Sequence, residues 1–194
     1  MNAFLEKVAL LPSTPAGGSV AALNAASAAA LAEMVSRLTA NNAQDKTIAK
    51  EMKEMEELFH DYRVKFTDTI DADAKAFAEV LNAYKLSADC DENIKIRDEK
   101  IQESYKNAVI VPIRLAKDIL AMMQLIKTQF RSIGDSYITD SAQAYMLAEA
   151  ALKSLIYHMK SNLIYIRDKE FTEKIEGVLE QLTLSLKCSE NLSH

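Results

Sequence analysis

The stretch that decides the fold lies near the start of the chain, where residues 14–34 read TPAGGSVAALNAASAAALAEM. Gly17 and Gly18 are two of only four glycines in the chain, and the run that follows them is dominated by alanine, a strong helix former. Ser19 is placed to cap that helix. A glycine-rich turn before a helix start suits an anionic or electron-rich ligand, and a tight turn before a packed central helix is the alternative.

Length and composition predict one globular domain over residues 1–194. Hydrophobic residues make up 49% of the chain and charged residues 26%, which is ordinary for a globular protein and argues against disorder. The net charge is −5, and no cluster of lysine and arginine stands out. Nucleic-acid binding through a basic patch is therefore not expected.

The sequence also predicts a cytoplasmic protein with no membrane partner. Cys90 and Cys188 are far apart and lack the spacing of a metal site, which fits a reducing compartment. The first residues lack the long apolar core of a secretory signal. The most apolar run, residues 20–32, contains Asn24 and Ser27 and is too short to span a bilayer.

Apolar residues recur at spacings typical of helices, and no segment alternates convincingly with period two. We expect an all-α bundle of five to six long antiparallel helices joined by short loops. Pro112 should kink the fourth helix, and Gly134 should end it. The expected helices cover residues 2–11, 19–39, 45–86 (one helix, or two in line), 93–132, 140–166 and 168–187. Between them we expect a loop at 12–18, a turn at Asn41-Asn42 and a polar loop at 87–91. Residues 189–194 are expected to be frayed.

Asp73 is the clearest polar residue in an apolar position. Phe66, Ile70, Asp73, Phe77, Val80 and Tyr84 follow one another at spacings of four and three, so the carboxylate occupies a place meant for a hydrophobic side chain. A carboxylate there must be paired, hydrogen-bonded or facing a cavity. Burial raises a carboxyl pKa, which suits proton transfer, and a structural aspartate bonded to a backbone or hydroxyl group is the alternative.

Two further places carry polar residues of interest. Asp140 begins a predicted helix with Gln143 three residues later, which is the spacing of a capping box, and capping alone would explain it. His158 and Asn162 are four residues apart and share a helix face with apolar neighbours. They are candidates for ligand binding, or else a satisfied pair in a core or interface.

A metal centre is not expected. Residues 57–60 match the Glu-x-x-His unit of di-iron helical bundles, but such a site needs the unit twice, and the chain holds one copy.

Taken together, these residues resemble the cyclodeaminase/cyclohydrolase family, a helical domain found alone in many bacteria and fused in formiminotransferase-cyclodeaminase. The resemblance covers nearly the whole chain, and the order and spacing of its pieces are fairly specific. It rests on residues 4–6, the glycine-rich loop and alanine helix at 14–23, residues 71–77 and 83–86, Val111-Pro112 with Leu115-Ala116, Thr139-Asp140, residues 149–152, Asn162-Leu163 and residues 169–171.

The resemblance implies an all-helical homodimer acting on one-carbon derivatives of tetrahydrofolate. Members close 5-formiminotetrahydrofolate with loss of ammonia, or hydrolyse 5,10-methenyltetrahydrofolate, with the folate as substrate and no permanently bound cofactor. Asp73 would then be the acid/base or hold the amino edge of the pterin, and Asp140 would be a second polar contact. The resemblance further assigns substrate binding to Gly17, Gly18, Ser19, His158, Asn162 and, at the folate's glutamate tail, Lys160.

The chain departs from the family pattern at three places. Its loop is shortened to Pro15-Ala16-Gly17-Gly18-Ser19, residues 41–44 stand where the family often has Gly-Lys-Lys, and His158 and Lys160 stand where many members have Asn and Arg. These departures bear on the reaction more than on the fold. A non-catalytic bundle that binds a small ligand or partner in the same cleft is therefore the competing hypothesis, and an enzyme for a different substrate is a third.

Overall fold

The structure is a computed structural model that describes residues 2–10 and 15–190, with side chains placed through residue 187. Every regular element in that part of the chain is helical, so the all-α prediction is confirmed. The helices are α1 (Asn2–Ala9), α2 (Gly17–Asn42), α3 (Lys46–Tyr84), α4 (Asp91–Gln129), a short 3₁₀ helix η1 (Asp135–Tyr137), α5 (Ile138–Leu163) and α6 (Lys169–Glu190).

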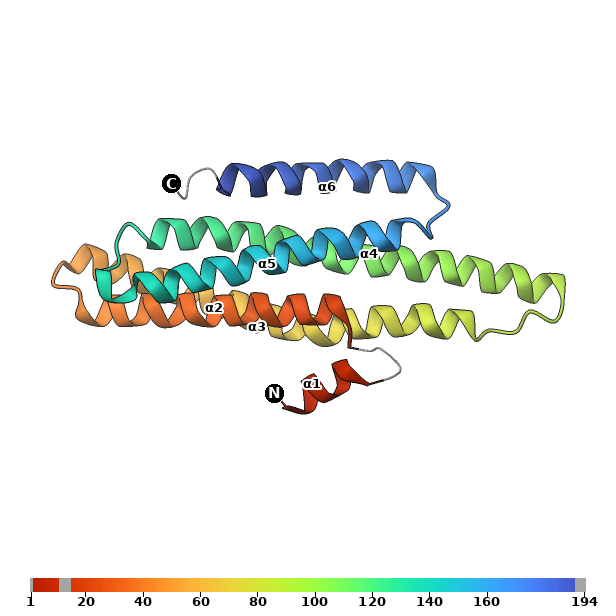
Figure 1. Cartoon of the computed structure of the whole chain (residues 1–194), viewed down its shortest axis with the longest axis horizontal. Coiled ribbons are helices and arrows are strands. Elements are labelled where there is room, and N and C mark those ends of the chain that lie inside the picture. The colour runs from red at the N-terminus through yellow and green to blue at the C-terminus, as the bar shows by residue number, and fades with distance from the viewer. Residues whose placement is uncertain (1, 11–14, 191–194) are drawn as a thin grey trace.

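Four helices form the body of the molecule. Helix α2 packs against α3 and α5, and α4 packs against the same two helices from the opposite corner. Figure 1 shows the four long helices side by side, with α6 along one edge of the bundle and α1 outside the opposite edge. Short connections between consecutive helices give antiparallel neighbours, as the sequence predicted.

The alanines of α2 explain why it lies at the centre of the bundle. Their small side chains are almost completely buried, so the neighbouring helices approach its backbone closely. Helix α2 is the one described helix that is long and apolar enough to cross a membrane. Because 61% of its most apolar window is buried inside the bundle, it has the pattern of a core helix. The most enclosed alanines are Ala21, Ala22, Ala25, Ala28, Ala29 and Ala32.

Several predicted boundaries differ from the structure. Asn41 and Asn42 form the last turn of α2 instead of a turn between helices. The stretch predicted at 45–86, as one helix or two in line, forms a single helix of 39 residues, α3, and α4 has the same length. Pro112 is buried inside α4 and does not divide it. Residue 11 at the predicted end of the first helix, residues 12–14 of the predicted loop at 12–18, and residues 191–194 of the predicted frayed end lie outside the described residues.

A buried polar network joins three helices at one end of the bundle. The side-chain amide of Gln129 on α4 donates to the Ala32 carbonyl at 2.8 Å and to Ser36 Oγ at 2.7 Å, both on α2. Its carbonyl oxygen accepts a hydrogen bond of 2.9 Å from Ser141 on α5. Gln129 is fully buried, so these bonds set how α2, α4 and α5 align along their axes.

Candidate functional site

Asp73 lies inside the bundle, where the start of α2, the last third of α3 and the last third of α5 meet. Its residue surface is 6% exposed, so the prediction that it occupies an apolar position is confirmed. Asp73 Oδ2 accepts a hydrogen bond of 3.0 Å from Ser19 Oγ on α2. Asp73 Oδ1 lies 3.9 Å from His158 Nε2 on α5.

Gly18 is required by this arrangement. A Cβ atom built at Gly18 would lie 2.2 Å from Asp73 Oδ1 and 2.6 Å from Cγ, much closer than any real contact. The glycine therefore lets a backbone approach closely, as predicted, but what approaches it is the carboxylate of the same chain. At Gly17 an added Cβ would meet no described atom within 4 Å.

The predicted cap at Ser19 is wrong. Helix α2 already begins at Gly17, and its cap residue Ala16 makes no side-chain capping bond. The Ser19 hydroxyl instead points across to α3, where it lies 3.0 Å from both Asp73 Oδ2 and the Ile70 carbonyl oxygen. The Asp73 carboxyl group therefore lies against the N-terminal turn of α2.

The hydrogen bonds that Ser19 can make differ between the protonated and the ionised form of Asp73. A serine hydroxyl has one hydrogen, and here it has two acceptors. If Asp73 is protonated, its own O–H donates to Ser19 Oγ and the Ser19 hydrogen is free for the Ile70 carbonyl. If Asp73 is ionised, the two acceptors share one hydrogen. The neutral acid therefore satisfies every polar atom of this group.

Asn162 and His158 form the other side of the site. Asn162 Nδ2 donates to the Ala108 carbonyl of α4 at 3.1 Å and lies 3.4 Å from His158 Nε2. His158 Nε2 therefore faces both the Asn162 amide and the Asp73 carboxyl. The 3.9 Å that separates His158 Nε2 from Asp73 Oδ1 is longer than a hydrogen bond, so the imidazole lies beside the carboxyl group without bonding to it.

Burial raises the pKa of Asp73 above its ordinary value. The positive charge of His158 and the hydrogen bonds from Ser19 act in the opposite direction but do not cancel the effect of burial. A carboxyl group with a raised pKa beside an imidazole is suited to general acid–base chemistry.

The remaining predicted site residues lie elsewhere in the protomer. Asp140 is the third residue of α5, where Tyr137 holds the cap position without a side-chain bond, so the predicted capping box is absent. Asp140 precedes His158 by 18 residues, or about 27 Å along the helix. Lys160 lines a groove between α5 and α6 and does not join Asp73. The structure brings together Gly18, Ser19, Asp73, His158 and Asn162.

A second buried charge was not predicted from the sequence. Glu33 on α2 is 5% exposed and is held by Arg63 Nε at 2.6 Å and by Arg37 Nη2 at 2.9 Å. Burial acts to raise the pKa of Glu33, but hydrogen bonds from Arg63, His60 and Arg37 outweigh it and keep the pKa below its ordinary value. The signal was present, because Glu33 is the only charged residue of the 14–34 stretch.

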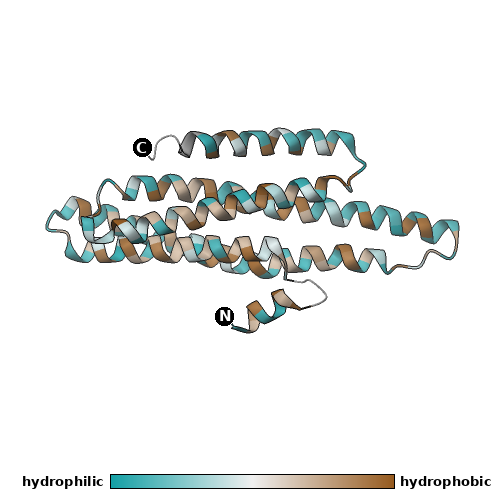
Figure 2. Ribbon diagram, in the orientation of Figure 1, coloured by the Kyte–Doolittle hydropathy of each residue, from teal (hydrophilic) through white to brown (hydrophobic). Residues whose placement is uncertain are grey.

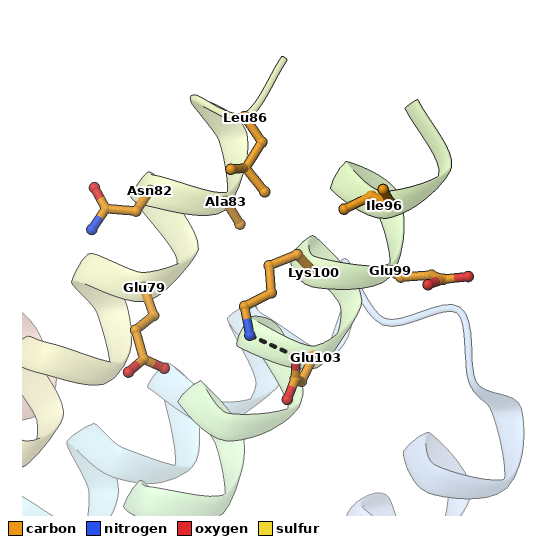
Figure 3. A pocket seen from close by; sticks show the side chains of 8 residues that line it. All are labelled: Glu79, Asn82, Ala83, Leu86, Ile96, Glu99, Lys100 and Glu103. Carbon is orange, nitrogen blue, oxygen red and sulfur yellow. Dashed lines mark hydrogen bonds and ion pairs between the residues drawn. The ribbon is translucent and has the colours of Figure 1, made fainter. Parts of the chain in front are cut away.

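A pocket of about 420 Å³ opens between the end of α3 and the start of α4. Figure 3 shows that Lys100 reaches from α4 across this pocket and that its ammonium group pairs with Glu103 at 2.8 Å. None of the predicted site residues lines it. We therefore do not assign the function of Asp73 to this pocket.

Comparison with known proteins places the chain in a family. The sequence pattern of the formiminotransferase-cyclodeaminase family matches residues 1–181. The chain belongs to this family. The resemblance seen in the sequence is thereby confirmed.

Individual members of the formiminotransferase-cyclodeaminase family support this assignment. The formimidoyltransferase-cyclodeaminase of Rattus norvegicus is 30% identical over 187 residues, which cover 96% of this chain and 35% of that protein. The chain thus spans about a third of the length of that relative. The methenyltetrahydrofolate cyclohydrolase of Methylorubrum extorquens is 29% identical over 93% of this chain and 89% of its own length.

A solved member of the family has the same fold. The crystal structure of a formiminotetrahydrofolate cyclodeaminase from Thermotoga maritima superposes with a TM-score of 0.86 at 25% sequence identity. The match covers 97% of this chain and 90% of that chain.

We predict that Gly18→Ala destabilises the protein and Gly17→Ala does not. The added methyl group at Gly18 must displace the Asp73 carboxylate, and overpacking of this kind costs about 1 to 3 kcal/mol. Gly17→Ala places its methyl group where no described atom lies within 4 Å and should be neutral or slightly stabilising. Urea unfolding of both variants measures the difference, and equal stabilities would show that Asp73 does not need the glycine.

We also predict a pH dependence of stability that belongs to Asp73. Below the ordinary pKa of 3.8 the carboxyl is protonated in the folded and unfolded chain alike. As the pH rises past 3.8 the unfolded chain ionises first, because burial raises the pKa in the folded chain, and the wild-type protein loses stability relative to Asp73→Asn. Urea unfolding at successive pH values should show this trend, and the opposite trend would mean that pairing with His158 outweighs burial.

Proposed function

We propose that the chain catalyses carbon–nitrogen bond chemistry at the one-carbon unit between N5 and N10 of a tetrahydrofolate derivative. The reaction is either cyclodeamination of the 5-formimino compound or hydrolysis of the 5,10-methenyl compound. Relatives with both names match almost the entire chain at similar identity, which supports the substrate class and leaves both reactions in view. The single observation that carries the proposal is the buried Asp73 carboxyl between Ser19 and His158.

Cyclodeamination needs a group that moves one proton between two nitrogens. N10 of the folate attacks the carbon of the protonated formimino group, whose terminal nitrogen carries two hydrogens, and N10 loses its proton. The bond from that carbon to the terminal nitrogen then breaks, and the terminal nitrogen leaves as ammonia after taking up a proton. Asp73 can accept the first proton as a carboxylate and deliver it as a carboxylic acid, because its pKa is raised toward the working range.

Hydrolysis makes a related demand on the same residues. Water adds to the methenyl carbon and gives up one proton, which leaves a hydroxyl group on that carbon. The hydroxyl group loses the second proton as the formyl C=O bond forms and the bond from this carbon to N5 opens. N5 takes up one of the two protons, and the other is released. His158 Nε2, 3.9 Å from Asp73 Oδ1, offers a second place for a proton during this exchange. In both reactions Ser19 and Asn162 would keep the two titrating groups in position.

We predict that Asp73→Asn keeps the fold and lowers turnover by about 10²- to 10⁴-fold, the usual contribution of a general acid–base group. The asparagine amide can donate to Ser19 Oγ as the protonated acid does, so the packing is preserved. Purified protein is mixed with 5,10-methenyltetrahydrofolate, and the near-ultraviolet absorbance of this folate is followed over time. Ammonia release from the 5-formimino compound is measured in parallel.

Asp71→Asn is the matched control, because Asp71 lies two residues away on the exposed side of α3. It should retain wild-type turnover. Full activity of folded Asp73→Asn would remove Asp73 from the mechanism. Absence of turnover by the wild-type protein with both compounds would favour a non-catalytic bundle that binds its ligand without converting it.

We further propose that the working form is a homodimer. Helix α2 is long and apolar enough to cross a membrane, yet the other helices do not cover its whole surface. The uncovered residues include the exposed Ala30 and the half-buried Leu23 and Met34. A helix that is apolar on all sides is normally covered on all sides. Figure 2 shows hydrophobic segments on α1 as well, and none of its residues is buried.

A second subunit on these surfaces would also give Asp140 or Lys160 a route to a substrate held at Asp73, which neither has within one protomer. We predict that sedimentation equilibrium returns twice the chain mass of 21.6 kDa. A monomer at micromolar concentration would contradict the proposal. Leu23→Glu and Met34→Glu should shift the equilibrium toward monomer, and Glu57→Gln, on the exposed side of α3, serves as the control.

We propose no permanently bound cofactor or metal for this reaction. Among the described residues, no three His, Cys, Asp or Glu side chains are grouped closely enough to hold a metal ion. The chemistry above requires only proton transfer and a one-carbon unit that the substrate brings. Turnover should therefore survive dialysis against a chelator.

A further inference from the structure

The proline inside α4 leaves one buried carbonyl group without its regular helical partner. In an α-helix, the carbonyl oxygen of residue 108 accepts a hydrogen bond from the N–H of residue 112. Residue 112 is Pro112, which lies inside α4 and has no N–H to donate. Ala108 and Pro112 are both buried, so the Ala108 carbonyl oxygen needs a donor from another part of the protein.

Asn162 on α5 supplies that donor. Its side-chain Nδ2 donates to the Ala108 carbonyl oxygen at 3.1 Å, and the residue is 6% exposed. A carbonyl oxygen can only accept a hydrogen bond, so the Nδ2 end of the Asn162 amide must face α4 and the Oδ1 end must face away. The orientation of this amide is thus fixed by a carbonyl group that Pro112 leaves free.

The orientation of the Asn162 amide determines which nitrogen of neutral His158 carries the hydrogen. Asn162 Nδ2 has two hydrogens, and the bond to Ala108 uses one of them. The other faces His158 Nε2, which lies 3.4 Å from Nδ2. This contact needs a lone pair on Nε2, so the neutral imidazole carries its hydrogen on Nδ1. The nitrogen that faces the Asp73 carboxyl group, 3.9 Å away, is therefore the one that can take up a proton.

We propose that Pro112 is a positioning residue for the acid–base chemistry of this site. It leaves the Ala108 carbonyl free to anchor the Asn162 amide, and the anchored amide keeps Nε2 of neutral His158 without a hydrogen. Pro112 acts only through these neighbours. Its contribution to turnover rests on the proposed folate reaction, whereas its effect on the His158 tautomer does not.

Pro112→Ala tests the proposal, because alanine restores the N–H of residue 112 and returns the Ala108 carbonyl to the helical hydrogen-bond pattern. Long-range proton–nitrogen NMR spectra at alkaline pH, where histidines are neutral, report which imidazole nitrogen carries the hydrogen. The signals of His158 are identified by their loss in His158→Gln. The wild-type protein should show the Nδ1–H form. Pro112→Ala and Asn162→Ala should each show a mixture of both tautomers.

Val109→Ala is the matched control. Val109 is fully buried on α4, next to Ala108. Val109→Ala and Pro112→Ala remove the same number of side-chain carbon atoms from the core, but only Pro112→Ala adds an N–H group. Val109→Ala should therefore keep the Nδ1–H form of His158. Pro112→Ala combined with Asn162→Ala should give the same tautomer mixture as Asn162→Ala alone, because both changes act through one contact.

Folate turnover gives the second readout. Pro112→Ala should lower kcat by up to about 100-fold and change KM little, because a small misplacement of an acid–base group slows the chemical step more than it weakens binding. A pure Nδ1–H form of His158 in Pro112→Ala, or wild-type kcat in that variant, would overturn the proposal. Absence of folate turnover by the wild-type protein would contradict the proposed function, and the NMR measurement would still decide whether Pro112 positions His158.

Discussion

The contact on which the site depends is the one between the Asp73 carboxylate and the backbone of Gly18. A Cβ atom at position 18 would overlap the carboxylate as it lies here, so any other residue type requires the Asp73 side chain to move. The contact does two things at once. It lets α3 lie against the start of α2, and it places an ionisable group in a buried position where hydrogen bonds from Ser19 define its surroundings. Packing of the helices and chemistry of the site therefore have the same origin.

Much of the fold could be read from the sequence, because long helices without glycine or proline leave clear periodic patterns. The apolar spacing along α3 also identified Asp73 before any coordinates were available. The boundaries of α2 were less well predicted. Gly17 and Gly18 were taken as a turn because glycine permits positive φ and a close backbone approach, whereas in the structure both lie in the first turn of α2.

Which residues lie together in one site was harder to predict than which single residues are of interest. Each of the five residues that the structure brings together was predicted individually, but their proximity depends on how α2, α3 and α5 pack. These residues are Gly18, Ser19, Asp73, His158 and Asn162. Asp140 and Lys160 came from a family resemblance that carries no distances, and within the protomer they lie away from Asp73. At the start of a helix, the Ser19 hydroxyl could either cap that helix or bond to a neighbouring helix. Only the packing of α3 shows that it faces the neighbouring helix. The charged group around Glu33 was missed because its partners are spread over two helices.

The alanine face of α2 has a mechanical consequence. Methyl groups have no rotamers, so the contacts that α2 makes along this face cannot adjust by side-chain rotation. A displacement anywhere along this face is passed to the backbone and moves the helix as a unit. The position of Ser19 opposite Asp73 is therefore set by the packing of the whole helix and not by its nearest neighbours alone.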